Sequence, residues 1–552
     1  MTIAWDEETD LVVIGAGAAG MTAALSARAA GLSVQVLEKT EQYGGTTALS
    51  GGVLWAPGHG LDERGRSEVA EQVLTYLRHN VGNRVADQKL VAFVREVPHM
   101  LALLTRNDFV RFESFASFPD YRPETPGGVP GGRSVEPRVF AGKRLGAEFP
   151  KLRRRAALAP GGIVGTMGEL RKLAEIRANP MVALAAWRAV ARSWWGRLTG
   201  AEHLSGGAAL AAWLRHALLK SDVPVRLSTA LRELVCEDGR VAGVVVESGG
   251  RALRLRARRG VVIAAGGFEH NADMRRQYDA DATSEYTSGA PGNTGDAIRA
   301  GQAIGAAVDL MEDAWWAPTF LPPGGAPQIV IFERAKPGNI IVDAAGNRFA
   351  NEALPYNDLV KQMQEANRHG AAAIPSFFVF DARYRERYPL AGMLPGITPQ
   401  RHIDSGFMAR ADSLAALAGA VGIDAAGLVA TVERFNAMAV RGVDEDFHRG
   451  ESAFDRFSGD PSVGPNTCLA PLDKPPFYAM KLWPGDLGTK GGLLTNEHAE
   501  VLRPDGSVIA GLYAAGNSSA SIMGHFYPGA GGTIGPAMTW GYIAAQRAAE
   551  MA

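Results

Sequence analysis

Residues 10–38 of the chain read DLVVIGAGAAGMTAALSARAAGLSVQVLE, and they decide the fold of its N-terminal part. An apolar strand ends in the spacing GxGxxG, an Ala- and Leu-rich helix follows, and a second strand leads to Glu38. This order is typical of a dinucleotide-binding βαβ unit. Gly15 permits the tight turn, Gly17 lets the backbone approach a pyrophosphate, and Gly20 lets the helix pack closely on the sheet.

Further segments indicate which dinucleotide binds there. Glu38 stands where a carboxylate would accept hydrogen bonds from a ribose, and its charge disfavours the 2′-phosphate of NADP. The cluster GGTTALSGG at residues 44–52 suits a flavin ring system, and GLYAAGN at residues 511–517 reads as a strand that returns to the same site. No second GxGxxG unit follows a strand, and no histidine in these segments stands out as an attachment point. We therefore expect non-covalent FAD, without NAD(P) as its redox partner.

The composition excludes several other classes of protein. With 57 Lys and Arg against 58 Asp and Glu in 552 residues, the net charge of −1 provides no field that would attract nucleic acid. The two cysteines, Cys236 and Cys468, cannot form a disulfide framework, and no clustered metal ligands appear. Residues 1–10 do not read as a signal peptide, and no run of about 18 apolar residues predicts a transmembrane helix. We expect a cytoplasmic protein with no metal site and no nucleic-acid partner.

The nucleotide-binding segments together resemble the FAD-binding domain of the fumarate reductase and succinate dehydrogenase flavoprotein superfamily. The resemblance extends to VVIAAGGF at residues 261–268, GNTGD at residues 292–296 and GNIIVDAAGNRFANE at residues 338–352. It implies an α/β protein in which a Rossmann-like FAD-binding domain, assembled from both ends of the chain, carries an inserted catalytic domain. The implied division is 1–315 and 487–552 for the FAD-binding domain, including an atypical insert at about 141–205, and 316–486 for the catalytic domain.

The glycine clusters and the resemblance together imply a set of FAD-contacting residues. The helix expected to begin near Thr533 would direct its N–H groups toward the electron-rich pyrimidine edge of the flavin. The full set is Gly15, Ala16, Gly17, Ala18, Ala19, Gly20, Glu38, Lys39, Gly45, Thr46, Thr47, Ser50, Gly51, Gly52, Ala265, Gly266, Asn293, Asp296, Gly516, Asn517, Thr533 and Ile534.

Two tyrosines stand where superfamily members that reduce fumarate would have arginines. The segments are NEALPY at residues 351–356 and YPGAGG at residues 527–532. A site for two carboxylates needs guanidinium groups that form bidentate pairs with them. A phenol is instead a neutral donor to a ketone oxygen or, when deprotonated, a base. Dicarboxylate chemistry is therefore disfavoured.

The same tyrosines are similar to those of one branch, the flavin-dependent 3-ketosteroid Δ1-dehydrogenases. The resemblance rests on FPDYRPE at residues 118–124, DLMEDAWWAPT at residues 309–319 and, most specifically, YPGAGGTIGPAMTWGYIAA at residues 527–545. It implies an enzyme that introduces a C1–C2 double bond into 3-ketosteroids in steroid degradation. The electron acceptor would be a quinone or a similar molecule.

The resemblance also implies roles for four residues. The Tyr527 hydroxyl and the Gly531 N–H would donate to the C3 carbonyl oxygen, Tyr356 would remove a proton from C2, and flavin N5 would take the C1 hydrogen as hydride. Two donors at the developing enolate oxygen make chemical sense, because C2 is acidic only beside a carbonyl group. The ordinary pKa of tyrosine is near 10, so Tyr356 needs help from a neighbour or from the electrostatics of the site to act near neutral pH, and Tyr121 is a candidate for that help.

Two other functions stay open. One is a related flavin enzyme, either a 3-ketosteroid Δ4-(5α)-dehydrogenase or a dehydrogenase of another neutral cyclic ketone. The other is a flavin-binding, membrane-associated partner protein without turnover. Reaction of the purified protein with ketones separates them.

The insert is unusually basic, with ten Lys and Arg residues between positions 151 and 200 but only Glu169 and Glu175 as acids. Residues 181–198 read as a helix. Its apolar side would carry Leu184, Trp187, Ala191, Trp194, Trp195 and Leu198, and another side Arg188 and Arg192. Two interpretations stay open: an interfacial helix that attaches residues 151–200 to the cytoplasmic face of a membrane, or a helical pair packed against protein.

Overall fold

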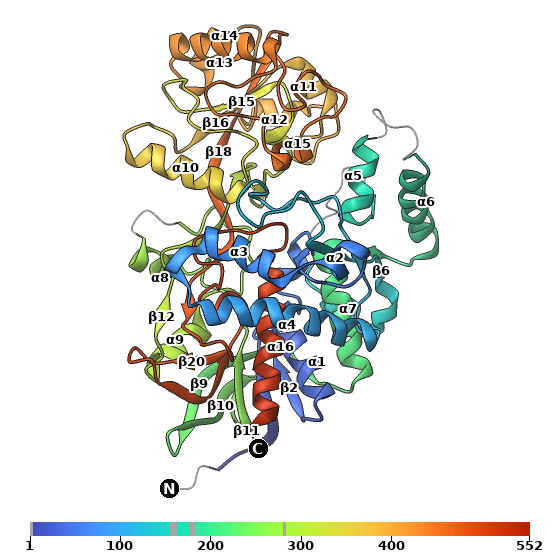
Figure 1. The fold of residues 1–552 in the computed structure, drawn as a ribbon, viewed down its shortest axis with the longest axis vertical. Coiled ribbons are helices and arrows are strands. Elements are labelled where there is room, and N and C mark those ends of the chain that lie inside the picture. Colours follow the sequence, from blue (N-terminus) through green and yellow to red (C-terminus); the bar gives the residue numbers. More distant parts are fainter. Residues whose placement is uncertain (1–3, 155–162, 176–182, 280–282, 552) are drawn as a thin grey trace.

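The computed structural model describes residues 4–154, 163–175, 183–279 and 283–551 of the chain. Figure 1 shows two units stacked along the long axis, with both chain termini near the bottom of the lower unit. The lower unit combines the blue and green N-terminal half with the red C-terminal segment, whereas the yellow and orange segment forms the upper unit. The two ends of the chain therefore meet in one unit.

A sheet of eight strands forms the centre of the lower unit. Strand β1 pairs in parallel with β2 and β11, and β11 pairs in parallel with β21, so strands from both ends of the chain lie side by side. Leu11, Val12 and Val13 of β1 are fully buried, as expected for a parallel strand that helices cover on both faces. The strands are β1 (Glu7–Ile14), β2 (Val34–Leu37), β8 (Val225–Arg226), β9 (Thr229–Glu237), β10 (Arg240–Ser248), β11 (Arg251–Ile263), β20 (Glu500–Leu502) and β21 (Val508–Ala514).

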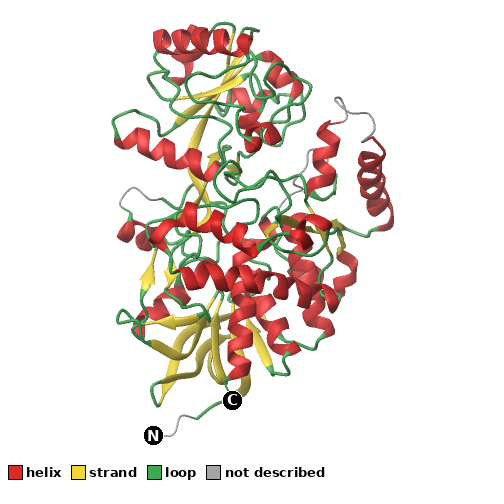
Figure 2. Cartoon of the chain, viewed as in Figure 1, coloured by secondary structure: helices red, strands yellow, loops and turns green. Residues whose placement is uncertain are grey.

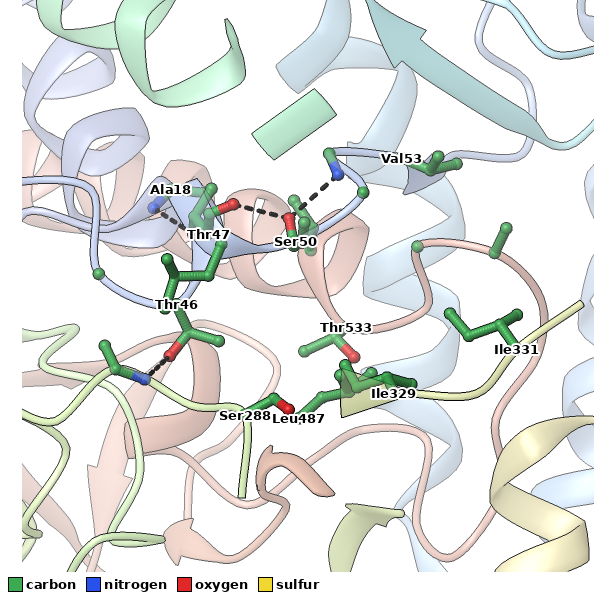
Figure 3. A pocket seen from close by; sticks show the side chains of 18 of the residues that line it. Ala18, Thr46, Thr47, Ser50, Val53, Ser288, Ile329, Ile331, Leu487 and Thr533 are labelled. Atoms are coloured by element: carbon green, nitrogen blue, oxygen red, sulfur yellow. Dashed lines mark hydrogen bonds between the residues drawn. The ribbon is translucent and has the colours of Figure 1, made fainter. Parts of the chain in front are cut away.

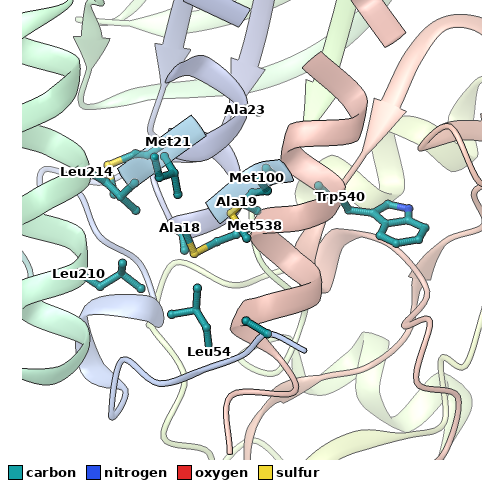
Figure 4. Close-up of a cluster of buried hydrophobic side chains, with 14 of the residues drawn as sticks. Ala18, Ala19, Met21, Ala23, Leu54, Met100, Leu210, Leu214, Met538 and Trp540 are labelled. Carbon is teal, nitrogen blue, oxygen red and sulfur yellow. The ribbon is translucent and has the colours of Figure 1, made fainter. Parts of the chain in front are cut away.

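Helices α1 and α16 pack against each other and thereby join both ends of the chain (Figure 4). Ala19 of α1 and Met538 of α16 are buried in one apolar cluster. A Cβ atom on Gly541 would lie 2.4 Å from the carbonyl oxygen of Ala19, so the two backbones approach closely. The helices of this unit are α1 (Ala18–Ala29), α2 (Glu63–Ser67), α3 (Ala70–Val81), α4 (Asp87–Arg106), α7 (Gly206–Lys220), α8 (Ala272–Tyr278), α9 (Asp296–Ala303) and α16 (Ile534–Glu550).

An antiparallel sheet with helices around it forms the upper unit (Figure 2). Its order is β14-β13-β18-β16-β15, and β17 adds to β18. The strands are β13 (Ala314–Phe320), β14 (Gln328–Ile329), β15 (Asn339–Val342), β16 (Ser376–Phe380), β17 (Ala409–Ala411) and β18 (Phe477–Thr489). The helices are α10 (Tyr356–Arg368), α11 (Ala382–Arg387), α12 (Gln400–Asp404), α13 (Leu414–Val421), α14 (Ala425–Arg441) and α15 (Ala453–Ser458).

The two paired strands β13 and β18 connect the units. The expected domain boundaries, 315/316 and 486/487, lie inside these strands. We propose that β13 and β18 are the junction between the FAD-binding and catalytic domains.

Short strands and a helical pair complete the structure. The strands are β3 (Leu54–Trp55), β4 (Phe112–Ser114), β5 (Ser134–Pro137), β6 (Phe140–Ala141), β7 (His203–Leu204), β12 (Val308–Asp309) and β19 (Gly492–Leu493), and the pair is α5 (Met167–Glu175) and α6 (Ala183–Thr199). Helix α6 overlaps the predicted helix at 181–198 and ends one residue later, at Thr199. Residues 181 and 182 and the side chains of Leu184 and Arg188 lie outside what the structure describes. None of the described helices is long and apolar enough to cross a membrane.

Candidate active site

A cavity of about 990 Å³ runs from the glycine turn after β1 to the junction between the two units. Figure 3 shows its middle part, where Thr46, Thr47 and Ser50 face Thr533 and Leu487 across open space. The wall is mainly apolar, and its polar groups gather at the glycine turn and loop of the lower unit and around Lys336, Arg387 and Asp460 of the upper unit. An elongated ligand with one polar and one apolar end fits this shape.

The three glycines of the turn are required for different structural reasons. Gly15 has φ +108°, and a Cβ atom there would lie 2.2 Å from the carbonyl oxygen of Ala264. A Cβ atom on Gly17 would meet only Thr47 Oγ1, at 3.7 Å, so the protein itself leaves room that a cavity occupant would need. Gly20 does not line the cavity: its Cβ position lies 2.0 Å from the carbonyl oxygen of Gly15, so it serves packing rather than contact.

Side-chain hydroxyls hold the loop that follows β2 against the turn. Thr47 Oγ1 accepts the Ala18 N–H at 3.1 Å, and Ser50 Oγ donates to the Thr47 carbonyl oxygen at 2.6 Å (Figure 3). Thr46 Oγ1 accepts the N–H of Ala290 and the side-chain amide of Asn293, both at 2.9 Å. Three segments that are distant in the sequence thus form one polar wall.

Glu38 reinforces the same turn. Its Oε2 accepts the Ala16 N–H at 3.1 Å, while its Oε1 accepts the N–H of Thr40 at 3.0 Å. Beside it, Lys39 Nζ contacts Asp296 Oδ2 at 2.5 Å, and both residues line the cavity. Every residue predicted to contact FAD, except Gly20, lies in the cavity wall. The glycine turn at the start of α1 and this polar wall fit FAD, with its phosphates at the helix N-terminus.

Three tyrosines meet in this cavity near the predicted flavin end. The ring centroids of Tyr121, Tyr356 and Tyr527 lie 5.2–5.5 Å apart in all three pairs. The Tyr527 hydroxyl also lies 3.0 Å from Thr533 Oγ1. The three residues come from three distant segments, so only folding brings them together.

Backbone and charged contacts fix these segments to one another. The Tyr121 N–H donates to the Pro528 carbonyl oxygen at 3.0 Å, and the Tyr76 hydroxyl donates to the same oxygen at 2.7 Å. Tyr356 is the first residue of α10, and Arg122 pairs with Asp358 of this helix at 3.0 Å. The segment with Tyr121 therefore touches both other tyrosine segments.

Gly531 lies in the cavity wall with φ +85°. A Cβ atom there would lie 2.3 Å from the Val53 carbonyl oxygen, so the backbone of β3 leaves no room for a side chain. Its N–H donates to no acceptor among the residues that the structure describes. A free N–H beside a tyrosine hydroxyl is suited to bind a carbonyl oxygen.

All three tyrosines have a pKa above the ordinary value of tyrosine. Burial, followed by the charge of Tyr121 and Tyr527 and hydrogen bonding to them, raises the pKa of Tyr356 well above its usual value. Burial also raises the pKa of Tyr121 and of Tyr527. The hydroxyl neighbours add no positive charge to offset burial, so Tyr121 does not lower the pKa of Tyr356 in this state, and its support of Tyr356 by a hydrogen bond stays a prediction.

An ion cluster centred on the buried pair Asp313 and Lys490 supports the Tyr527 loop. Asp313 Oδ2 lies 3.5 Å from Lys490 Nζ, 3.4 Å from Lys361 Nζ and 2.8 Å from His525 Nδ1. Lys490 Nζ donates to the Phe526 carbonyl oxygen at 3.1 Å, and Lys361 Nζ donates to that of His525 at 2.7 Å. His525 thus makes a structural hydrogen bond and does not line the cavity, and the sequence did not single out the two lysines.

Much of the apolar wall was also not foreseen. Besides the tyrosines, the cavity is lined by Phe115, Phe118, Ile329, Ile331, Phe332, Leu390, Leu394, Phe457 and Leu487. These residues come from loops and strand ends of both units and follow no local pattern that marks a site. Among the described residues, no group of three or more His, Cys, Asp or Glu could hold a metal ion.

Comparison with known proteins identifies the family. Residues 10–534 match the FAD binding domain family. The 3-oxosteroid 1-dehydrogenase of Mycobacterium tuberculosis (strain H37Rv) is 46% identical over 559 residues, covering 99% of each chain. The crystal structure of 3-ketosteroid Δ1-dehydrogenase from Sterolibacterium denitrificans, in complex with 1,4-androstadiene-3,17-dione, matches with a TM-score of 0.94 and 40% identity, covering 98% of this chain and 99% of that one. The chain belongs to the 3-ketosteroid Δ1-dehydrogenase family.

This membership of the 3-ketosteroid Δ1-dehydrogenase family confirms the predicted resemblance and FAD as the cofactor. An open-conformation flavocytochrome c3 fumarate reductase shares the fold at 21% identity, with a TM-score of 0.66 over 99% of this chain and 79% of that one. The predicted α/β flavoprotein fold of the fumarate reductase type, with its Rossmann-like domain, is therefore also confirmed.

Proposed function

We propose that this protein is an FAD-dependent oxidoreductase that introduces a C1–C2 double bond into 3-ketosteroids. The observation that carries this proposal is that Tyr121, Tyr356, Tyr527 and Gly531 line one large, mainly apolar cavity, where the Gly531 N–H has no acceptor among the described residues. A steroid is flat and apolar and has one polar end, so it needs such a cavity. Family membership supports the same reaction.

The roles of these residues follow from their chemistry. The Tyr527 hydroxyl and the Gly531 N–H donate to the C3 carbonyl oxygen and stabilise the enolate that develops there. Tyr356 accepts the proton from C2, and Tyr121 orients it from 5.5 Å away, centroid to centroid. When bound, FAD supplies the acceptor for the hydride that leaves C1. The apolar wall excludes water from this step.

Non-covalent FAD and an acceptor other than NAD(P) are part of the proposal. Neither histidine nor cysteine is found among the described residues that line the cavity, which supports attachment without a covalent bond. The upper sheet contains only antiparallel pairs, so it offers no parallel βαβ unit for a nicotinamide. A quinone or a similar molecule is the proposed acceptor.

Anaerobic mixing of the holoenzyme with 4-androstene-3,17-dione tests the reaction. We expect the flavin absorbance to bleach and a product two hydrogens lighter, with a C1–C2 double bond, to form. Bleaching only with 5α-saturated 3-ketosteroids would favour a Δ4-(5α)-dehydrogenase, and bleaching only with small cyclic ketones would favour that substrate class. FAD binding with no bleaching by any of these ketones would favour the non-enzymatic alternative.

We also propose that the protein lies in the cytoplasm and binds the cytoplasmic face of a membrane through the α5–α6 pair. Trp187, Trp194, Trp195 and Leu198 of α6 are 65–78% exposed, and such an apolar face suits the lipid head-group region. Met167 and Leu170 of the neighbouring α5 line the cavity, so a lipid-soluble steroid could pass from the bilayer to the site.

The α6 surface is tested with vesicles that contain anionic lipid. Replacing Trp187, Trp194 and Trp195 by Ser should abolish cosedimentation of the holoenzyme with the vesicles while leaving FAD bound. A matched triple change of exposed apolar residues in the upper unit, Ile397→Ser, Val440→Ser and Val443→Ser, should leave cosedimentation unchanged. Cosedimentation that survives the Trp changes, or a concentration-dependent dimer that only the Trp changes dissociate, would contradict the membrane site.

A further inference from the structure

The cavity wall changes from apolar to cationic beyond the tyrosines. Successive contacts lead from Tyr121 to Phe118, at 6.4 Å between ring centroids, and from Phe118 to Phe457, at 4.6 Å. The Arg171 guanidinium lies 3.5 Å from the centre of the Phe457 ring. Arg171 and Lys336 both line the cavity, although its ligand is expected to be apolar.

Lys336 has capacity for another partner. Its Nζ donates to the Gly459 carbonyl oxygen at 2.8 Å, and an ammonium group has three donors. No described carboxylate oxygen lies within the 4.0 Å that defines an ion pair with it. Burial lowers the pKa of Lys336, the charge of Arg171 lowers it further, and the charges of Asp460 and Glu333 oppose this shift.

The acids nearby are already engaged. Asp460 Oδ2 accepts hydrogen bonds from Arg387 Nε and from the Tyr388 hydroxyl, both at 2.7 Å. Glu333 Oε2 accepts the Ile331 N–H at 3.0 Å. Among the described residues, no carboxylate therefore forms an ion pair with Lys336, and a positive charge in a largely apolar cavity is costly unless a ligand supplies an anion.

We propose that Lys336 binds a carboxylate at the end of a side chain on the D ring of the 3-ketosteroid, with Arg171 adding to the positive field. This inference rests on the proposed function, because a ketone held at Tyr527 and Gly531 directs the opposite end of the steroid along the Phe118–Phe457 wall. Neutral steroids would use the same cavity without this contact. The preferred substrate class is thus a 3-ketosteroid acid.

The test compares 3-oxo-4-pregnene-20-carboxylate with its methyl ester, which has the same ring system but no charge. In the wild-type holoenzyme we expect kcat/KM for the acid to exceed that for the ester. Lys336→Met should lower this acid-to-ester ratio about tenfold, the effect of losing one charge-assisted hydrogen bond. Lys336→Arg should retain most of the ratio, because it keeps a cation at the same place.

Lys474 provides a matched control, since its side chain is 52% exposed and pairs with Glu386 outside the cavity. Lys474→Met should leave the ratio at the wild-type value. An unchanged ratio in Lys336→Met would overturn the carboxylate site. If neither steroid is turned over, the proposed function fails instead, and calorimetric Kd values for the acid and the ester in both lysine variants still decide whether Lys336 selects the acid.

Discussion

At the scale of single residues, Tyr527 and Tyr356 lie in the same buried site but have different proposed roles, because one donates a hydrogen bond and the other accepts a proton. Tyr527 has Thr533 Oγ1 at 3.0 Å and can keep its proton while it donates to the substrate oxygen. Tyr356 must lose its proton before it can accept one from C2. The same Tyr→Phe change should therefore have different consequences at the two positions.

Tyr527→Phe removes one donor to the enolate oxygen. We expect kcat to fall by about 10²–10³, the cost of one oxyanion-hole donor in a water-excluded site. The rate of flavin bleaching with 4-androstene-3,17-dione measures this loss, and the FAD absorbance of the purified variant reports that the cofactor remains bound. Full turnover would remove Tyr527 from the mechanism.

The rate should also rise with pH. Tyr356 acts only as a phenolate, and its pKa is raised well above 10 in the folded protein, so its active fraction grows about tenfold per pH unit throughout the range below that pKa. Stopped-flow bleaching rates between pH 6 and 9 should show this slope in the wild type and, at lower amplitude, in Tyr527→Phe. A flat profile, or an unchanged profile in Tyr356→Phe, would contradict this role.

At the scale of elements, two loops are held by features that lie outside them. The Gly531 turn rests on the backbone of β3, and the residues before Tyr527 rest on lysines from β18–β19 and α10. The shape of the donor site is therefore set by packing between elements rather than by the loop sequence.

Gly531→Ala should impair both stability and turnover. The added Cβ atom would lie 2.3 Å from the Val53 carbonyl oxygen, and the alanine would have to adopt a φ angle of +85°. The backbone of β3 and the N–H of residue 531 must therefore move apart. Gly370→Ala is the matched control, because Gly370 has φ +91° but no heavy atom within 4 Å of the added Cβ. We expect the control to cost only about 1 kcal/mol of backbone strain and no activity; equal losses in both variants would show that φ alone matters.

Lys490→Met should disturb the loop that carries Tyr527, because Lys490 holds the backbone of this loop at Phe526. It removes the donor to the Phe526 carbonyl oxygen and leaves Asp313 with weaker pairing, which we expect to cost about 3 kcal/mol of stability. Thermal unfolding measures this loss, and kcat should fall more than KM rises, because the loop positions the donors. Lys89→Met is a control, since this buried lysine bonds Thr495 outside the cavity wall; it should lose stability without the change in kcat.

At the scale of the whole molecule, the cavity joins the two units, because its wall takes residues from both. Removing FAD should therefore lower the melting temperature of the protein, and adding FAD back should restore it. At a hundredfold excess over Kd, a ligand that binds only the folded state contributes about 2.7 kcal/mol. Thermal shift measurements on apo and reconstituted protein check this, and an unchanged melting temperature would show that the cofactor adds nothing to the folded state.

The sequence by itself determined the local elements and the short motifs, because both depend on residues that are adjacent in the chain. The segment from Asp10 to Glu38 predicted a strand, a glycine turn, a helix and a second strand. The two strands are β1 and β2, and the helix is α1; β1 begins three residues earlier than expected. Tyr121, Tyr356 and Tyr527 could be singled out because their short motifs resemble those of one family. Each of these signals lies within a few adjacent residues.

Only the tertiary structure decided how distant residues act on one another. Burial, followed by the neighbouring Tyr121 and Tyr527, raises the pKa of Tyr356, although the sequence had offered Tyr121 only as a neighbour that helps Tyr356 to act as a base. The lysines that contact the Tyr527 loop, the position of Gly20 away from the cavity and the lack of a carboxylate partner for Lys336 among the described residues likewise follow from contacts between segments up to hundreds of residues apart. Desolvation and Coulomb energies depend on these distances in space, which no local pattern encodes.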